Sequence, residues 1–450
     1  MSIVAGTNTL RNCLTAAIVA AACSVPLGAP GAQDVPMFRG DLAHTGAFAT
    51  KGPTSLEVKW KFATGGYVIS SPVVVGQTVY IGSTDGQLYA LDRATGAKRW
   101  SFATHARIAS TPAVSRDLLY VLSYDDTLYA IDVTTGQAKW RFGTEGEHRY
   151  TATYLHGTLP RHEAMPDPYD TYLSSPAVAN GIVYFGSGDS HVYALDAASG
   201  TLRWKRKTGD VVHSSPAVVN GTVYIGGWDT FFYALDAGTG DVRWTFKTGN
   251  DTVSHNQVGI PSSPAVVAGI VYFGCRDSHV YAVDAATGKE KWRRRNGGAW
   301  IISSPAVANG RVYYTTADRT SLVELDAATG DSLWAARGGF YYFASPAIAG
   351  NMVYAGNWDG RLYAFDMTTR AQTALFETDS SRANRAKYLK PDNTRNFGAA
   401  LPQHEYFYDQ HVIALSRAWT MGSFLSSPVI SDGVLFVGSM DGNLYALGGR

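Results

Sequence analysis

The hydrophobic positions of this chain fall into short runs separated by Gly, Asn, Asp and Pro. Residues 175–204 (SPAVANGIVYFGSGDSHVYALDAASGTLRW) show the pattern. Asn180-Gly181 is a typical hairpin turn, and Gly200 is free to take the positive φ that a tight turn requires. Pro176 suits the first position of a strand, where no ladder N–H is lost. We expect short strands over 176–178, 182–186, 191–195 and 202–205, and no 3.6-residue period that would indicate helices.

The same unit recurs with a basic period of roughly 40 residues. Its Ser/Thr-Pro step places a proline at residues 72, 112, 176, 216, 264, 305, 346 and 428. In six units a Trp follows eight residues after an aspartate: Asp92/Trp100, Asp132/Trp140, Asp196/Trp204, Asp236/Trp244, Asp284/Trp292 and Asp326/Trp334. Four short strands per unit describe a propeller blade. The sequence therefore predicts an all-β, eight-bladed β-propeller of four-stranded antiparallel blades.

The two ends of the repeat region complement each other. The last unit, 427–447, stops after its third strand, while 57–64 (EVKWKFAT) resembles the fourth strand 97–104 (AKRWSFAT). We expect Trp60 to complete the last blade, because closure removes an exposed strand edge at each end. The seventh unit has Arg370 for Gly and Ala374 for Trp. We interpret the following 377–425 as an insertion rather than a ninth blade, because only 411–415 weakly resembles a strand of the repeat.

The leader and the charge balance indicate where the chain acts: the leader predicts export, and the charge balance argues against nucleic-acid binding. Lys+Arg 38 against Asp+Glu 37 leaves a net charge of +1, so no basic field indicates nucleic-acid binding. Residues 1–32 have the pattern of a signal peptide, with lipidation at Cys23 as the alternative, and 33–55 form a lead-in segment. No other stretch is long and apolar enough to span a bilayer. We expect a periplasmic or secreted protein, or a lipid-anchored one, that forms a monomeric ring.

Three long insertions, 143–173, 249–261 and 377–425, all interrupt blade-to-blade connections. Strand order places these connections and the turns between second and third strands on one face, and long loops on a rigid ring are usual sites of function. The insertions and their borders hold several imidazoles, carboxylates and amides: Glu147, His148, Asp167, Asp170, His213, His255, Asn256, Gln257 and His411. Glu147, His148, Asn256 and Asp277 are weak metal candidates. Because no metal-ligand spacing occurs, we favour solvated loop histidines.

Three turns on that face carry unusually large side chains. Trp228 precedes Asp229, Arg276 precedes Asp277, and Trp358 precedes Asp359. The aspartates recur in all eight blades, so their default role is turn capping. Trp228, Arg276 and Trp358 depart from the pattern and are candidates for ligand contact, with packing against the insertions as the alternative.

Other positions on this face add aromatic groups and one thiol. Trp300 and Tyr341 each stand five residues before a blade proline and are expected near the channel mouth, as is Tyr67. Cys275 is the lone cysteine of the repeat region, so no disulfide is available to it. Arg276 beside it would favour a thiolate, but strand-end cysteines are usually small buried residues.

Segments such as 89–100 (YALDRATGAKRW) and the SSPAV starts resemble the quinoprotein-type (PQQ-like) propeller repeats over about residues 35–447. The resemblance implies either of two activities. One is a binding or scaffold protein for a cell-envelope partner, like the barrel-assembly lipoproteins. The other is a PQQ- and Ca²⁺-dependent alcohol or sugar dehydrogenase, with Trp228 or Trp300 stacking the quinone, Arg276 pairing its charge, and Asn256 and Asp277 supplying oxygen.

The enzyme interpretation lacks several parts. The adjacent cysteine pair of the larger dehydrogenases has no counterpart, and no CxxCH haem motif occurs. We therefore prefer the scaffold over the enzyme, and keep a carbohydrate or small-ligand binder that uses the aromatic face as a third class.

Overall fold

The structure is a computed structural model that describes residues 2, 34–153, 155, 163–249, 258–400, 403 and 406–449. The chain divides into two compact units, Met1–Gly31 and Ala32–Arg450. Only the second is described below. The leader and Cys23 lie outside the described residues, so the signal peptide and the lipidation alternative stay predictions. None of the described helices combines the length and the hydrophobicity that crossing a bilayer requires.

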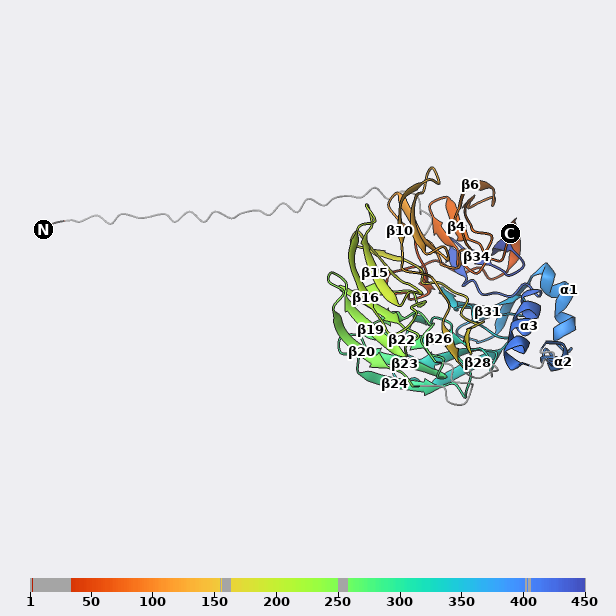
Figure 1. Ribbon diagram of the computed structural model, residues 1–450. Coiled ribbons are helices and arrows are strands. Elements are labelled where there is room, and N and C mark those ends of the chain that lie inside the picture. Colours follow the sequence, from red (N-terminus) through yellow and green to blue (C-terminus); the bar gives the residue numbers. More distant parts are fainter. Residues whose placement is uncertain are drawn as a thin grey trace. The chain divides into compact units, whose positions relative to one another are not determined.

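Eight four-stranded antiparallel sheets follow one another in chain order around a ring (Figure 1). The first four blades are β3 (Val73–Val75), β4 (Thr78–Gly82), β5 (Gln87–Asp92), β6 (Lys98–Ala103); β7 (Ala113–Ser115), β8 (Leu118–Ser123), β9 (Thr127–Asp132), β10 (Ala138–Gly143); β13 (Ala177–Ala179), β14 (Ile182–Gly186), β15 (His191–Asp196), β16 (Leu202–Lys207); and β17 (Ala217–Val219), β18 (Thr222–Gly226), β19 (Phe231–Asp236), β20 (Val242–Lys247).

The remaining blades are β21 (Ala265–Val267), β22 (Ile270–Gly274), β23 (His279–Asp284), β24 (Glu290–Arg295); β25 (Ala306–Ala308), β26 (Arg311–Thr315), β27 (Ser321–Asp326), β28 (Ser332–Arg337); β29 (Ala347–Ala349), β30 (Met352–Gly356), β31 (Arg361–Asp366), β32 (Gln372–Glu377); and β33 (Val429–Ser431), β34 (Val434–Gly438), β35 (Asn443–Gly448) with β2 (Glu57–Ala63). The inner three strands of each blade are buried and the outer strand alternates between exposed and half-buried positions. The predicted eight-bladed propeller is confirmed.

The last blade is completed by the N-terminal strand, as the sequence predicts. β2 pairs antiparallel with β35, and Trp60 lies opposite Ala446. The two ends of the repeat region are therefore held together by a strand ladder. Unfolding the terminal blade must break contacts that are far apart in sequence.

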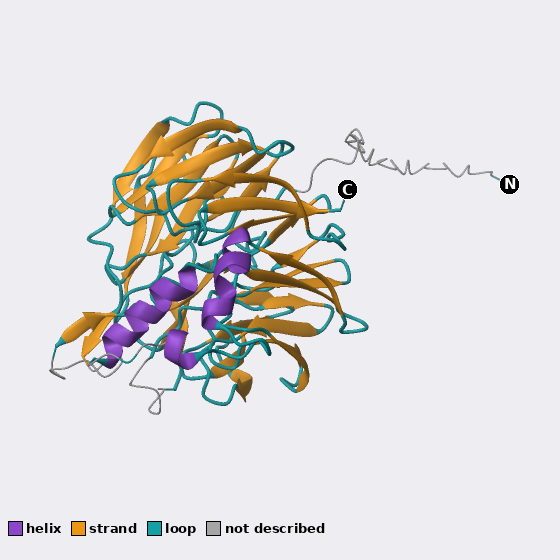
Figure 2. Cartoon of the chain, turned by 90° about the vertical axis from the view of Figure 1, so that its right-hand side faces the viewer, coloured by secondary structure: helices purple, strands orange, loops and turns teal. Residues whose placement is uncertain are grey.

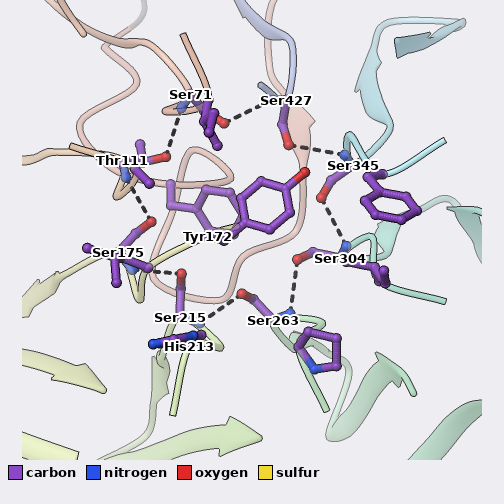
Figure 3. Close-up of a pocket in the computed structure, with 17 residues that line it drawn as sticks. Ser71, Thr111, Tyr172, Ser175, His213, Ser215, Ser263, Ser304, Ser345 and Ser427 are labelled. Atoms are coloured by element: carbon purple, nitrogen blue, oxygen red, sulfur yellow. Dashed lines mark hydrogen bonds between the residues drawn. The ribbon is translucent and has the colours of Figure 1, made fainter. Parts of the chain in front are cut away.

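A ring of hydroxyls ties the eight blades together at the axis (Figure 3). In each blade the backbone N–H before the blade proline donates to the side-chain oxygen of the equivalent residue in the next blade. The members are Ser71, Thr111, Ser175, Ser215, Ser263, Ser304, Ser345 and Ser427, and Ser427 donates back to Ser71. The donor–acceptor distances run from 2.8 to 3.1 Å. A cavity of about 40 Å³ remains at the ring, enough for a few water molecules.

The lead-in segment closes one side of the channel. Its carbonyls accept N–H bonds from the innermost strands of six blades, at Val74, Val114, Val218, Val266, Val307 and Ile348. Its short strand β1 (Ala47–Phe48) pairs parallel with β29. Because one segment bonds to so many blades, it fixes their spacing around the axis.

Neighbouring blades are locked by the recurring Trp. The Nε1–H of Trp204 donates to the carbonyl of Ala237 in the next blade at 3.0 Å. The turn glycine Gly240 has φ +75°, and a Cβ there would lie 2.7 Å from the Trp204 ring. The glycine is therefore required both by its backbone and by the indole beside it.

The two departures in the seventh blade have separate explanations. Ala374 replaces Trp in β32, and the blade that follows has no Asp-to-Gly turn for an indole to cover, because its outer strand comes from the N-terminus. Arg370 replaces the turn glycine and keeps a positive φ of 61°. Its guanidinium Nε lies 3.1 Å from Glu324 of the preceding blade.

The insertions add the irregular elements. The first contains the hairpin β11 (Thr151–Thr153) and β12 (Ala164–Pro166), and the third contains α1 (Asp379–Tyr388), α2 (Phe397–Ala400) and α3 (Phe407–Trp419). The three helices gather beside one another (Figure 2). Residues 411–415 lie within α3 and not in a strand, and the described residues of 377–425 form no ninth blade.

Replacing Gly240 by Ala should lower the melting temperature more than replacing Gly181, which has the same φ of +75° but no atom within 4 Å of the added Cβ. Both variants strain the backbone equally, and only Gly240→Ala overpacks the Trp204 ring, at an extra cost of about 1–3 kcal/mol. Thermal unfolding followed by circular dichroism measures the difference. Equal losses in the two variants would show that the indole contact is not what constrains the glycine.

Candidate functional site on the loop-rich face

The loop-rich face contains a buried ion pair. Arg276 extends from the turn between β22 and β23, and its Nη1 lies 2.5 Å from Oδ2 of Asp167 in the first insertion. Both side chains are 0 % exposed. Removing two charges from water is costly, so the pair is stable only because each charge compensates the other. The interaction ties the first insertion to the fifth blade.

Two indoles enclose the same guanidinium. The Arg276 Cζ lies 4.9 Å from the centre of the Trp228 ring and 4.2 Å from that of Trp300. Tyr150 of the first insertion stacks on Trp228 with ring centres 4.6 Å apart and planes 15° apart. The ring faces thus stabilise the cation where water cannot reach it.

A second aromatic cluster joins the first and third insertions. Tyr169 packs edge-on against Trp300 and stacks near Trp358 at 6.4 Å. Its hydroxyl lies 2.5 Å from Nδ1 of His411 in α3. Burial raises the pKa of Tyr169 well above its ordinary value, so the phenol stays neutral. Tyr341 packs edge-on against Trp358 at 5.5 Å.

His213 forms a third buried group beneath the first insertion. Its Nδ1 lies 2.7 Å from Asp170, and its Nε2 lies 3.7 Å from Glu147. Burial alone would lower the pKa of His213, but the charge and hydrogen bond of Asp170, followed by those of Glu147, raise it to about 10. Glu147 also accepts the backbone N–H of Gly188. The imidazolium therefore anchors two insertion carboxylates to the third and fourth blades.

The recurring aspartates cap turns. Asp229 accepts the N–H groups of Gly209 and Phe231 and the hydroxyl of Tyr233. Asp277 accepts the N–H groups of Gly249 and His279, the latter at 3.1 Å, and the hydroxyl of Tyr281. Both carboxylates are thereby engaged within the repeat.

The remaining predicted residues are placed as follows. Trp358 is buried at 1 % exposure, and Tyr67 is 44 % exposed and packs edge-on against Trp419. His148 is exposed. His255, Asn256 and Gln257 lie outside the described residues. In the part of the chain that the structure describes, no three His, Cys, Asp or Glu side chains gather as a metal site.

Cys275 is a small buried residue, as its place at a strand end predicts, and not a thiolate. Cys275 is fully buried, and its Sγ bonds the carbonyl of Gly259. Burial, followed by the charge of Asp277, raises its pKa well above the ordinary thiol value. Arg276 does not offset this effect because its charge is paired with Asp167.

The residues expected to hold a quinone do not fit one in this arrangement. Tyr150 covers Trp228, while Arg276 and Tyr169 cover Trp300, so the described side chains leave no open aromatic face at these positions. Arg276 and Asp277, expected to contact the cofactor and Ca²⁺, are engaged with groups of the chain itself. A planar cofactor would have to displace the first insertion.

The groups that organise this face were only partly visible in the sequence. The sequence shows Asp167, Asp170 and His411 only as loop residues of equal standing, and nothing in it distinguishes Tyr150 and Tyr169 from the many other tyrosines. Each contacts a residue of another blade or insertion that is distant in sequence.

This fold and this face define a PQQ-like β-propeller with an internally packed loop surface. The family model described as outer membrane protein assembly factor BamB matches residues 48–158, 163–299 and 259–388. The chain belongs to this family. A search of curated proteins found no match.

Solved structures share the fold at low sequence identity. BamB from Moraxella catarrhalis is 15 % identical with a TM-score of 0.62, covering 88 % of this chain and 98 % of its own. Quinohemoprotein alcohol dehydrogenase from Comamonas testosteroni is 15 % identical with a TM-score of 0.66, covering 93 % and 81 %. A europium-containing methanol dehydrogenase is 15 % identical with a TM-score of 0.65, covering 93 % and 98 %. At this identity the likeness shows the fold alone.

Replacing only one member of the buried ion pair should be costly. Asp167→Leu leaves the Arg276 charge buried without this carboxylate and should lower the unfolding free energy by about 3–5 kcal/mol. The double variant Asp167→Leu/Arg276→Met removes both charges and should lose less than Asp167→Leu alone. Urea unfolding of both variants and of Arg276→Met measures the coupling. Additive losses would contradict a coupled pair.

The stabilisation from His213 should depend on pH. Its folded-state pKa of about 10 lies above the ordinary 6.5, so the contribution is complete below pH 6.5 and is lost as the pH rises through about 10. The difference in melting temperature between the wild type and His213→Gln should therefore be largest near pH 6 and shrink toward pH 10. A difference that stays constant over this range would contradict a protonated His213.

Proposed function

We propose that this chain is an exported cell-envelope propeller that binds a partner protein through its loop-rich face and serves as a scaffold. The observation that supports the proposal is that the buried charged and aromatic groups of that face contact one another. Its interior charges and aromatic rings are satisfied by one another, with Arg276 and Asp167 both 0 % exposed. Such a face suits recognition by its outer surface better than chemistry in its interior.

The third insertion supplies that outer surface. Val412 on α3 is 42 % exposed, and Tyr406, just before α3, is 37 % exposed. The helix is held from beneath, because the Tyr408 hydroxyl donates to the carbonyl of Pro166 at 2.7 Å and His411 bonds Tyr169. Rigid elements with exposed apolar and aromatic side chains are suited to protein contacts.

Membership of the family described as outer membrane protein assembly factor BamB supports the envelope assignment. The quinone-dependent dehydrogenase remains the alternative. It rests on the same fold likeness and requires the first insertion to leave Trp228 and Trp300.

A cross-linker placed on α3 tests the proposal. A photoreactive amino acid at Val412 in living cells should give a discrete adduct with an outer-membrane protein. The same group at Ala94, an exposed position in the turn between β5 and β6, serves as the control for chance collisions. Equal labelling from both positions, or no adduct from α3, would contradict a partner on this face.

Titration with PQQ and Ca²⁺ tests the alternative. We expect no saturable change in the quinone absorption spectrum and no dye-linked alcohol oxidation, because the stacking faces are covered. Stoichiometric quinone binding together with alcohol oxidation would overturn the scaffold assignment.

A further inference from the structure

A cleft of about 570 Å³ opens between the sixth and seventh blades, apart from the buried ion pair described above. Four arginines from four different elements line it: Arg319 in the turn between β26 and β27, Arg337 at the end of β28, Arg361 at the start of β31, and Arg395 between α1 and α2. The carboxylates in its lining are Asp318 and Asp392. The lining therefore carries an excess of positive charge, and a cleft concentrates such a field.

Two of these arginines have no partner of their own. Arg319 and Arg337 are both exposed, and within the described chain neither guanidinium forms a hydrogen bond or an ion pair. On the outer strands of two other blades, Arg99 and Arg243 each pair with the aspartate that precedes the adjoining turn, at 2.7 Å. Arg319 and Arg337 form no such ion pair within the described chain, so their charges are available to a ligand of the cleft.

The other cleft arginines are held in place. Arg395 lies over the Tyr341 ring at 4.8 Å, and its Nη2 donates to the carbonyl of Asp318 at 3.3 Å. Arg361 Nε lies 3.5 Å from Glu377. Asp392 accepts from the backbone and hydroxyl of Thr394, which holds its carboxylate locally. Arg319 and Arg337 therefore share the cleft with charged side chains that are held by other groups of the chain.

The cleft also borders an unprotected strand edge. β32 is the outermost strand of its sheet, and Leu375 on it lines the cleft at 41 % exposure. The other seven outer strands all contain Lys or Arg, whereas β32 (QTALFE) contains neither. Basic residues on edge strands discourage pairing with other chains, so β32 is the outer strand most open to an added strand.

We infer that this cleft binds an extended, acidic segment of a partner polypeptide. Its carboxylates pair with Arg319 and Arg337, its apolar side chains contact Leu375, and its backbone lies along β32. A polypeptide is favoured over a small anion because the open edge and Leu375 give a small anion nothing to bind. The inference rests on the proposed scaffold function and names the chemistry of one partner segment.

The test uses a fluorescein-labelled peptide of alternating Glu and Val, with an alternating Lys and Val peptide for comparison. We expect the acidic peptide alone to bind, with an affinity that falls as salt is added. Arg319→Glu/Arg337→Glu should weaken binding by about tenfold or more. The control Arg141→Glu/Arg294→Glu changes the charge equally on the exposed outer strands β10 and β24 and should change affinity less than about twofold.

A second matched pair tests the strand contact. Leu375→Ser should weaken binding measurably, whereas Leu202→Ser, at the same 41 % exposure on β16, should not. Equal losses in the two charge-reversed proteins, or in the two Leu variants, would overturn the inference. Inorganic phosphate could also displace the peptide at concentrations that screen charges only weakly, as judged on the control proteins. That result would overturn the inference in favour of a small-anion site.

The outcome is separable from that of the proposed function. If the Val412 cross-link forms but the acidic peptide does not bind, the scaffold assignment stands and the cleft inference falls. If the peptide binds at the cleft but Val412 gives no adduct in cells, the inference about the cleft stands and the role of the helical insertion falls.

Discussion

Closure of the ring is the constraint on which the rest of this structure depends. Each blade donates one backbone N–H to a hydroxyl of its neighbour, and the chain of bonds is complete only because Ser427 reaches Ser71. The pairing of β2 with β35 and the lead-in segment, which bonds to six inner strands, reinforce the same closure. A closed ring needs no disulfide for stability, since every inner strand is buried between two neighbours. It also gives the loops a rigid base, so that insertions distant in sequence meet over the channel.

Residues that depart from the repeat are explained by the side chains, insertions or chain ends that contact each blade. Glycine is kept in the outer turn where an indole of the preceding blade lies against it, as at Gly240 and Trp204. Ala374 stands where no such turn follows. The same logic applies to Arg276, which replaces a small turn residue where the first insertion provides Asp167 and two indoles enclose the charge. Exceptional residues therefore mark the blades that the insertions or the chain ends contact.

Belonging to a family does not decide what the loop-rich face does, because a propeller supports both scaffolding and catalysis. The arrangement of this face narrows the choice. The side chains that could stack on or pair with a cofactor pack against one another instead. The exposed side chains of α3, and the unpaired arginines of the cleft between the sixth and seventh blades, face outward. The helix α3 and the arginine cleft both adjoin the seventh blade, which is the blade that departs most from the repeat.

From the sequence alone follow the blade number, the strand pattern, the closure by Trp60 and the gathering of insertions on one face. Each of these depends on short-range pattern: alternation, turn residues and a fixed period, repeated eight times. The partners of the candidate residues were decided by tertiary structure. Arg276 could be identified as exceptional, but the ion pair with Asp167 joins positions more than a hundred residues apart, and the sequence did not distinguish ligand contact from packing. The arginine cleft escaped prediction for the same reason, because its members come from two blades and an insertion. Charge and packing at these positions depend on distances through space, which a one-dimensional pattern does not contain.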